Sequence, residues 1–552
     1  MKYAALPRLL RTLRPMRAEQ VWAQLAYAVR GPGAPVRLDE APPRLSTASG
    51  AVPFLPAPAH ARGNGRQLEL LNVEVQLGDP PDWDVGQAGP LWSYHLHQFD
   101  WLRQPDLSAQ RRTELLLDWV TRHPRGVGWN PHPISLRILS WGKLFLTPGA
   151  LDLDAAAADA LHLSMASQAE TLARHPEKRL QANHLLSNWL GVVFAGLLLQ
   201  GDRADRWLRG SHALRRELAR QIDADGAHVE RSPMYHSLLL ENLLDLLNLA
   251  RAVPERAPAE LVRDLEDCAS RMLAALGVWT HPDGGIALFG DSAFGIAQLP
   301  STLVAYGAAL GVTPRGPRQA DVLRDAGFVR LQEGPFTLLA SLAGPMPAYQ
   351  PGHAHCDALS FELSVGEERV VTDAGVAEYI PGALRDTSRA TRSHATLEIG
   401  GLDQAEVWSA HRMGGRPAVR QEVSESPHVA EASCAGWATP DSLHHRVFTV
   451  RDGAVEIRDR VEGPPRPVRA SLPLAPGLQP ELQQVGEGRA ALRIVLASGA
   501  ELSVELPDTF TWSLERSSYM PEFGRSQDRV CVVGRADSFA EGTWRFRSDV
   551  AG

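Results

Sequence analysis

The stretch Thr313-Pro314-Arg315-Gly316-Pro317 divides the chain into two parts with different sequence patterns. Before it, from about Arg17 to Leu310, apolar residues recur at three- and four-residue steps, which is the period of helices that bury one face. After it the period becomes two, which is typical of strands. A run of helices followed by a run of strands predicts an α+β protein with segregated domains and excludes alternating βαβ units.

Individual elements follow from this pattern. Helices are expected near residues 110–122, 134–146, 154–174, 184–200, 205–222, 234–252 and 258–278. Strands are expected at Ala358–Val365, Ala395–Ile399, Arg446–Val450, Ala454–Arg458, Leu492–Ala497 and Glu501–Leu506. The pair Asp452-Gly453 separates two of these strands as a hairpin turn would.

The predicted elements suggest where the domains lie. The Pro- and Gly-rich stretch from Gly31 to Pro58 indicates a linker that follows an N-terminal helix. We therefore expect an N-terminal helix and linker at 1–60, a helical domain at 61–315 and an antiparallel β domain at 316–552.

Composition excludes several classes of protein. The chain has 552 residues with a formal net charge of −8, so no global basic field favours nucleic acid. No uncharged apolar run reaches the ~20 residues that a membrane span needs. No continuous apolar signal-peptide core follows the basic N-terminus. We expect a chain that binds no nucleic acid, spans no membrane and is cytoplasmic by default, with a periplasmic or extracellular location still open.

The first chemical constellation is Gln181-Ala182-Asn183-His184, which opens the apolar helix through Leu198. The free backbone N–H groups and the dipole of a helix N-terminus favour an anion such as a sugar carboxylate. Asn183 and His184 are therefore candidates for binding one. The alternative interpretation is that Asn183 simply caps the helix.

The second constellation is Glu230-Arg231-Ser232-Pro233-Met234-Tyr235-His236. Ser232 as the N-cap and Pro233 as the first helical residue predict the start of a helix. Tyr235 and His236 then lie in its first turn, where a phenol can give or take a proton at the end of the helical layer. The alternative is an aromatic side chain tucked under a helix end.

The third constellation is Gly352-His353-Ala354-His355-Cys356-Asp357, with Asp373 on the next predicted strand and His394 further along. If the motif opens a strand, alternation puts His353 and His355 on the same face. Imidazoles and a carboxylate on adjacent strands are typical of a divalent-metal site. The sequence therefore predicts a metal or catalytic site here.

In this order, the three constellations resemble the heparinase II/III family of polysaccharide lyases. The segments His281-Pro282-Asp283-Gly284-Gly285 and Phe289-Gly290-Asp291-Ser292 add to the resemblance. It implies an incomplete α/α toroid followed by an antiparallel β-sandwich.

The resemblance also implies roles for individual residues. Asn183 and His184 match the positions that bind and neutralise a uronate carboxylate, and Tyr235 matches the catalytic tyrosine. His353 matches a β-domain histidine that reaches into the cleft. Where some members have a glutamate one turn after the Asn-His pair, this chain has Ser187.

Further residues are assigned to metal and substrate. The resemblance implies a structural divalent metal, zinc in the family, held by His355, Asp373 and His394. His236 is a secondary candidate for positioning the substrate. Candidates for lining the sugar cleft lie in the helical part: Trp92, Trp129 and Asn130.

A mechanism follows from the chemistry of a uronic acid, whose C5 proton leaves only if the adjacent carboxylate is neutralised. Asn183 and His184 would neutralise it, and Tyr235 would protonate the leaving oxygen at C4. Either Tyr235 or His353 would remove the C5 proton. We expect a lyase that cleaves acidic polysaccharides by β-elimination and leaves 4,5-unsaturated uronate ends. Heparan-like, other glycosaminoglycan-like and bacterial exopolysaccharide substrates all fit.

Two other functions remain open at this point. One is a hydrolase whose metal, held by His353, His355, Asp373 and His394, activates water. The other is a non-catalytic glycan-binding protein of polysaccharide synthesis or export. Under the lyase hypothesis, the helical domain supplies the carboxylate site and the β domain supplies His353, so the active site should be a cleft between the domains.

Overall fold

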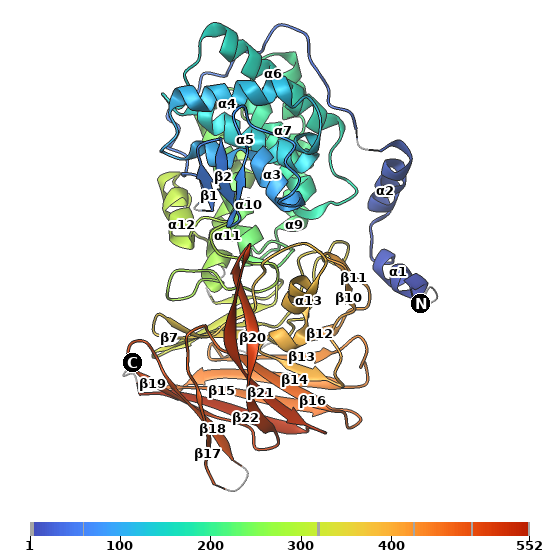
Figure 1. Ribbon diagram of the computed structural model, residues 1–552, viewed down its shortest axis with the longest axis vertical. Coiled ribbons are helices and arrows are strands. Elements are labelled where there is room, and N and C mark those ends of the chain that lie inside the picture. The colour runs from blue at the N-terminus through green and yellow to red at the C-terminus, as the bar shows by residue number, and fades with distance from the viewer. Residues whose placement is uncertain are drawn as a thin grey trace.

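Two domains stacked along the long axis make up the computed structural model in Figure 1, helical above and β-rich below. The structure describes residues 5–31, 33–58, 60–316, 321–422, 426–486 and 489–549. The predicted α+β class and the order of the two domains are confirmed. The last helix of the upper domain ends at Ala309 and the first strand of the lower one begins at Val322.

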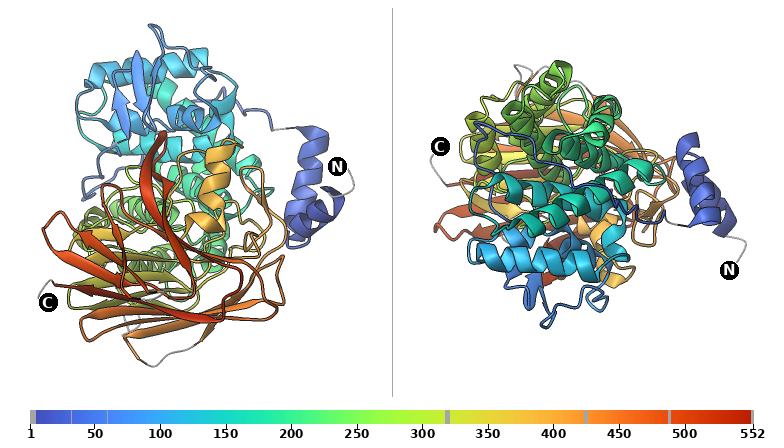
Figure 2. Two further views of the ribbon diagram at one scale, coloured as in Figure 1. Left: turned by 60° about the horizontal axis from the view of Figure 1, so that its bottom comes forward. Right: turned by 90° about the horizontal axis from the view of Figure 1, so that it is seen from above.

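The chain begins with two helices that stand beside both domains (Figure 2). They are α1 (Ala5–Leu13) and α2 (Ala18–Arg30), where the sequence indicated one helix. Residues 33–58 carry no helix or strand. A small sheet that the sequence analysis missed follows, formed by β1 (Ala61–Gly63), β2 (Gln67–Leu70) and β3 (Val73–Gln76).

Ten α-helices form the toroid. They are α3 (Pro90–Gln98), α4 (Ala109–Arg122), α5 (Pro131–Leu146), α6 (Ala155–Arg174), α7 (Ala182–Leu198), α8 (Asp202–Leu208), α9 (Ser211–Gln221), α10 (Pro233–Ala252), α11 (Ala259–Val278) and α12 (Pro300–Ala309). Short 3-10 turns follow α3 (η1, Asp100–Arg103) and precede α5 (η2, Val127–Trp129). All seven expected helices are present, but the one expected at 205–222 is split into α8 and α9.

Helix α7 lies inside the toroid and is buried on almost every side, packed on α5, α6, α9 and α10. Small residues permit this close approach. A side chain at Gly142 of α5 would collide with Phe194, and one at Gly191 would lie 3.0 Å from the Cα atom of Ser135. Because the interior is close-packed, the start of α7 is held rigidly at the end of the toroid.

The lower domain is an antiparallel sandwich. Its largest sheet has eight strands in the order β12 (Ala418–Glu422), β13 (Val429–Ala435), β14 (Leu443–Arg451), β15 (Ala454–Glu462), β22 (Glu541–Ser548), β19 (Glu501–Glu505), β18 (Ala490–Val495) and β17 (Glu481–Gln484). A five-stranded sheet contains β4 (Val322–Leu323), β5 (Phe328–Glu333), β6 (Phe336–Ser341), β7 (Phe361–Val365) and β8 (Glu368–Val371). Phe361 of β7 contacts Phe448 and Phe546 of the large sheet, which places the sandwich core between them.

Smaller elements complete this domain. A four-stranded sheet has the order β20 (Thr511–Glu522), β21 (Arg525–Ala536), β16 (Val468–Pro473) and β9 (Leu397–Ile399). The pair β10 (Val407–Trp408) and β11 (Arg412–Met413), helix α13 (Ala383–Arg389) and the turn η3 (Thr391–Ser393) lie towards the helices. The hairpin turn expected at Asp452-Gly453 joins β14 to β15, with both residues at positive φ.

The long hairpin β20–β21 rises from the β domain to the helices (Figure 1). Phe523 at its tip is buried in the core of the helical domain. The side-chain amide of Asn72 donates to Glu522 Oε2 and to the carbonyl of Phe523, both at 2.9 Å. Gly524 has a φ of +75°, and a side chain there would collide with the carbonyl oxygen of Leu71. The hairpin therefore fixes the two domains to each other.

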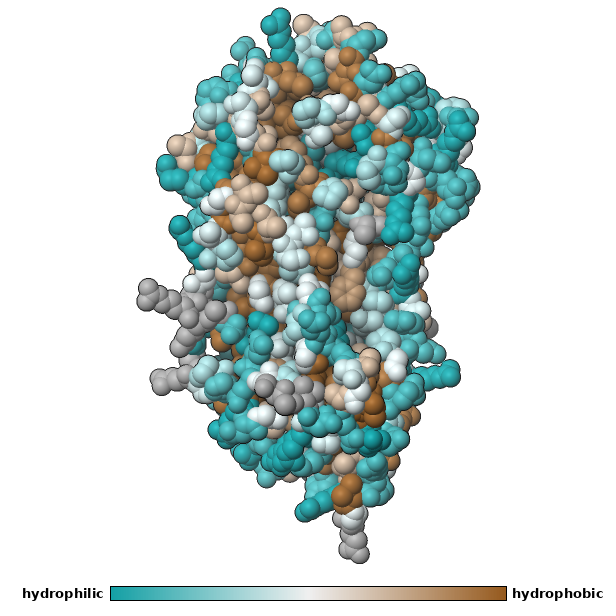
Figure 3. All heavy atoms as spheres, turned by 90° about the vertical axis from the view of Figure 1, so that its left-hand side faces the viewer, coloured by the Kyte–Doolittle hydropathy of each residue, from teal (hydrophilic) through white to brown (hydrophobic). Residues whose placement is uncertain are grey.

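The surface differs between the domains on the face in Figure 3. Hydrophobic residues gather along the middle of the helical half, whereas the β-rich half is mostly hydrophilic. Among the described residues, no helix combines the length and the apolar character that crossing a membrane requires.

Candidate active site

Two helix N-termini meet where the domains touch, and strained backbone precedes each of them. Gln181 and Ala182 at the start of α7 have φ values of 59° and 47°, and Arg231 before α10 has a φ of 56°. Residues without a glycine's freedom rarely adopt this region, and such strain concentrates at functional sites. Gln181, not Asn183, occupies the N-cap position, so the interpretation of Asn183 as a simple cap is wrong.

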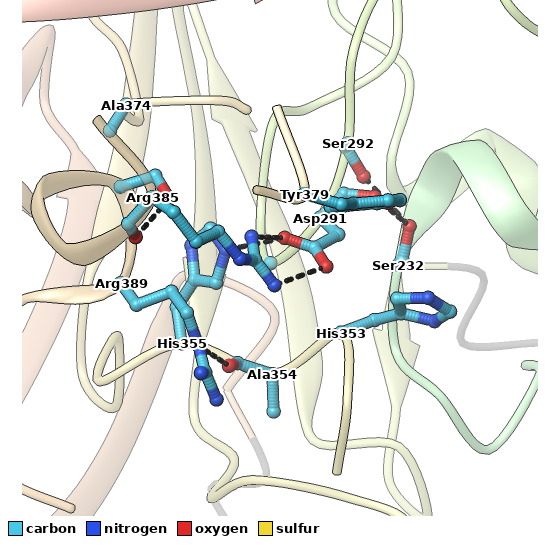
Figure 4. Close-up of polar contacts among 12 residues, drawn as sticks. Ser232, Asp291, Ser292, His353, Ala354, His355, Ala374, Tyr379, Arg385 and Arg389 are labelled. Atoms are coloured by element: carbon cyan, nitrogen blue, oxygen red, sulfur yellow. Dashed lines mark hydrogen bonds and ion pairs between the residues drawn. The ribbon is translucent and has the colours of Figure 1, made fainter. Parts of the chain in front are cut away.

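The predicted start of α10 is confirmed. Ser232 Oγ accepts a hydrogen bond from the backbone N–H of Tyr235 at 3.2 Å and donates to the carbonyl of Asp291 at 2.7 Å (Figure 4). Pro233 is the first helical residue. The cap therefore ties the first turn of α10 to the segment that carries Asp291.

Glu230 joins the helical domain to the β domain at this point. Its carboxylate accepts hydrogen bonds from the backbone N–H and the side-chain amide of Asn183, both at 2.9 Å, and from His353 Nδ1 at 2.5 Å. Burial alone would raise the pKa of Glu230, but His353 and Asn183 outweigh it and lower the pKa to about 2. Glu230 is therefore a carboxylate that positions both neighbours.

Tyr235 lies flat against His353, with ring centroids 4.0 Å apart and an angle of 14° between the rings. Its hydroxyl lies 3.0 Å from that of Tyr379. Burial raises the pKa of Tyr235, and the nearby charges of Asp291 and Glu230 raise it further. The phenol therefore stays protonated, which suits it to donate a proton.

His184 is paired with a different acid. Its Nδ1 atom lies 3.0 Å from Glu177 Oε2, and its ring packs on His132 at 4.3 Å between centroids. Burial alone would lower the pKa of His184, but Glu177 outweighs burial and raises it. Burial and the charge of His184 lower the pKa of His132 to about 3. His184 is therefore the cation of this pair and His132 is neutral.

A cavity of about 960 Å³, including its open mouth, lies mostly within the helical domain, and residues of the β domain complete its lining. Asn183, Ser187 and Tyr235 line it from the helical side, and Tyr379 and Phe523 line it from the β side. His184 reaches this wall through its ring contact with His132, which also lines the cavity. Asn183 and Tyr235 line the cavity directly, whereas His184 and His353 lie one ring contact behind its wall, packed on His132 and Tyr235.

His355, Asp373 and His394 form a buried group whose potential ligand atoms lie within 4.8 Å of one another. His394 Nδ1 lies 2.8 Å from Asp373 Oδ2. His355 Nδ1 and His394 Nε2 are buried without a hydrogen-bond partner. Orphaned imidazole nitrogens beside a carboxylate fit a divalent metal such as zinc.

The expected common face of His353 and His355 is wrong. Residues 351–360 form a loop instead of a strand, and β7 begins only at Phe361. Figure 4 shows the imidazoles in different surroundings: His355 bonds to Asp291 at 2.8 Å, whereas His353 lies towards Ser232. A water-activating metal held by all four predicted ligands does not fit this geometry.

Asp291 connects the potential metal site with the tyrosines. It accepts from His355 and makes a two-point ion pair with Arg385, and the guanidinium of Arg385 lies 5.0 Å from the ring centre of Tyr379 (Figure 4). Burial alone would raise the pKa of Asp291, but Arg385 and His355 hold it well below its usual value. The ion pair fixes the loop that carries Tyr379 beside Tyr235.

Two cleft-lining assignments, Trp92 and Trp129, are wrong, and so is the assignment of His236 to substrate positioning. His236 is fully buried, with Nε2 bonded to the carbonyl of Met272 at 2.9 Å, so it faces the core. Trp92 is also in the core and donates to the carbonyl of Val73. Trp129 stacks on Trp119 away from the cavity.

Asn130 does not line the cavity but contacts a residue that does. Its side-chain amide donates to the hydroxyl of Tyr94 at 3.2 Å, and Tyr94 lines the cavity. Asn130 therefore positions a lining residue instead of lining the cavity itself.

Sequence reasoning assigned no role to Glu230, Glu177 or Tyr379. Glu230 stands in the quoted motif two residues before the helix cap, which is a signal that could have identified it. Nothing local distinguishes Glu177 or Tyr379, because each gains its partner only through the fold.

Comparison with known proteins supplies the family. The protein-family model described as "Heparinase II/III N-terminus" matches residues 97–305, and the family model described as "Heparinase II/III-like, C-terminal" matches residues 315–544. A heparin-sulfate lyase of Pedobacter heparinus is 28% identical over 319 residues, which cover 51% of this chain and 46% of the relative. The match therefore spans about half the length of that curated relative.

Solved structures share the fold. A heparan sulfate lyase mutant from Pedobacter heparinus superposes with a TM-score of 0.60 at 19% identity, covering 90% of this chain and 82% of the other. A heparinase III structure gives 0.62 at 16% identity, covering 85% and 79%. With both domains matched in order by the family models, the chain belongs to the heparinase II/III family.

Proposed function

We propose that the protein is a polysaccharide lyase that cleaves uronic-acid-containing glycans by β-elimination. The observation that carries the proposal is that Asn183 and Tyr235 line one cavity while His184 and His353 pack directly behind its wall, on His132 and Tyr235. The heparin-sulfate lyase relative supports an acidic glycan as the substrate.

The uronate carboxylate would be bound by Asn183 and His184. An amide nitrogen carries two N–H groups, so Asn183 has one left for the substrate after donating to Glu230. His184, kept protonated by Glu177, adds positive charge. Neutralising the carboxylate lowers the barrier to forming the enolate-like state at C5.

The proton transfers fall to His353 and Tyr235. Glu230 accepts a hydrogen bond from His353 Nδ1, and because a carboxylate can only accept, the lone pair of the neutral imidazole is on Nε2. His353 can therefore remove the C5 proton. Tyr235, whose pKa is raised, would donate its proton to the glycosidic oxygen that leaves C4.

We further propose that His355, Asp373 and His394 hold a structural divalent metal, zinc by the resemblance. When bound, such an ion would crosslink the loop before β7, the segment after β8 and the end of η3. His355 would then hold Asp291, and Asp291 would hold Arg385 beneath Tyr379.

The proposal is tested by supplying the full-length protein with a panel of uronate polymers and following the absorbance of the C4–C5 double bond. Tyr235→Phe should lower kcat by ~10²- to 10⁴-fold, the usual contribution of acid–base catalysis. Tyr349→Phe is the matched control, because its hydroxyl has no hydrogen-bond partner. Activity of Tyr235→Phe within a few-fold of the parent would remove the tyrosine from the mechanism.

A further inference from the structure

Helices α1 and α2 stand beside the two domains (Figures 1 and 2) and contact them through polar side chains. In α1, the guanidinium groups of Arg8 and Arg11 pair with Glu406 at 3.1 and 2.7 Å. Thr12 accepts a hydrogen bond from the Trp408 indole at 3.2 Å. One side of α1 therefore faces the β domain.

The other side of α1 is apolar and exposed. Successive helical residues turn by about 100°, so Leu6, Leu10 and Leu13 lie opposite the face that holds Arg8 and Arg11. Their exposed fractions are 61%, 60% and 43%. Leucines this exposed bury little apolar surface when the chain folds, so folding alone does not account for them.

Helix α2 repeats the arrangement. Gln20 is buried against the body, and Tyr27 lies under the guanidinium of Arg179. Trp22, Leu25 and Val29 lie on the opposite side, with exposed fractions of 72%, 53% and 86%. Both apolar stripes therefore face away from the protein.

The concentration of exposed apolar side chains in this segment is high. Of the nineteen exposed large apolar residues in the described part of the chain, nine lie between residues 6 and 29. Apolar surface gathered in this way marks an interaction site.

The charge of the N-terminal segment, residues 1–30, indicates what kind of partner it binds. The first thirty residues carry six basic side chains and only Glu19 as an acid, so the segment keeps an excess of positive charge even with Glu406 paired to Arg8 and Arg11, in a chain whose net charge is −8. Arg14 is exposed beside the leucines. A basic helix with leucines and a tryptophan on its outer face is the pattern that binds in the plane of an anionic lipid surface.

We propose that α1 and α2 dock the protein on an anionic membrane surface. With 9 and 13 residues the helices are too short to cross a bilayer, so their outer faces lie in its interface. The inference stands apart from the proposed function. It has a geometric consequence, because Arg17 donates to Gln181 and Gln20 donates to the carbonyl of Tyr349. These contacts lie within four residues of Asn183 and His353, so docking holds the active-site end of the cavity close to the membrane.

The test is co-sedimentation of the full-length protein with vesicles of phosphatidylcholine alone or mixed with phosphatidylglycerol. The mixed vesicles should bind the protein, and 0.5 M salt should weaken binding because it screens the attraction. Trp22→Gln combined with Leu25→Gln should weaken binding about tenfold or more, since two side chains lose their apolar contact. The matched control is Leu402→Gln with Val495→Gln, residues 46% and 50% exposed in the β domain, which should bind like the parent.

Thermal unfolding checks that all variants are folded. Equal binding of parent and Trp22/Leu25 variant, or binding to neutral vesicles as tight as to anionic ones, would overturn the proposal. So would a parent that ignores vesicles but self-associates in solution through Trp22 and Leu25, because the surface would then belong to a second copy of the chain.

Discussion

The substitution Glu230→Gln tests the arrangement of the site most sharply, because one carboxylate positions residues from both domains. Glutamine keeps the size of the side chain but removes its charge. His353 then loses the charged acceptor that fixes its Nδ1 proton, and a single amide oxygen cannot replace both carboxylate oxygens that accept from Asn183. Removing the carboxylate that orients a catalytic imidazole costs on the order of 10²- to 10⁴-fold in kcat.

The same substitution has a predictable effect on stability. The pKa of Glu230 is lowered from 4.5 to about 2. This shift means that ionised Glu230 contributes roughly 3 kcal/mol more to the free energy of unfolding than the protonated form does. A lowered pKa adds stability above the unfolded-state pKa, and this stability is lost as pH falls through about 2. At neutral pH, Glu230→Gln should therefore lower the free energy of unfolding by up to about 3 kcal/mol.

Measuring kcat by double-bond absorbance and the free energy of unfolding by denaturant separates the two effects. Glu170→Gln is the matched control, since Glu170 is a buried acid bonded to Arg174 and Trp207 away from the cavity. It should lose stability and keep its kcat. A Glu230→Gln enzyme that retains more than half of the parent kcat would refute the role of Glu230 in holding His353.

Three further predictions concern charge, metal and the domain contact. The kcat/KM should fall as pH rises through the raised pKa of His184. In Glu177→Gln this fall should occur at lower pH, because burial alone lowers the pKa of His184; a fall at an unchanged pH would contradict the role of His184 as the cation. Chelation or His355→Ala should lower the Tm before it lowers activity at a temperature where the protein stays folded, and elemental analysis that finds no metal would exclude the site. Phe523→Ala, which empties the buried tip of β20–β21, should destabilise the protein by ~3–5 kcal/mol in denaturant unfolding and raise KM, whereas an unchanged free energy of unfolding would show that the hairpin does not fix the domains.

The sequence predicted long periodic elements best. Helix α10 was placed within a residue of its start, because Ser232 and Pro233 are local signals that need no tertiary context. Short elements were missed: α3 has nine residues and β2 has four, too few for a period to emerge. The break between α8 and α9 at Arg209-Gly210 was also missed, because a continuous apolar pattern runs across it.

For the site, the sequence identified most of the chemically important residues but not how they are arranged in space. Asn183, His184, Tyr235 and His353 were singled out, and the fold brings them together. The HxH motif misled because alternation applies to strands, and this motif lies in a loop that separates its two imidazoles.

Other errors reflect contacts made only in the folded chain. Trp92 was expected in the cleft because aromatic rings bind sugars, yet its ring is fully buried in the toroid core. Glu177 could not be recognised as the partner of His184, because the two are seven positions apart across irregular chain and the start of a helix. Only the fold brings them to 3.0 Å.

The reaction proposed for this chain is elimination and not hydrolysis. The most direct measurement is the proton NMR spectrum of the oligosaccharides that the full-length protein releases from a uronate polymer. We expect a vinylic H4 signal from a 4,5-unsaturated uronate at each new non-reducing end, and we expect no such signal when Tyr235→Phe replaces the parent. Saturated ends that have taken up water, or polymers of every uronate class left intact by folded protein, would contradict it.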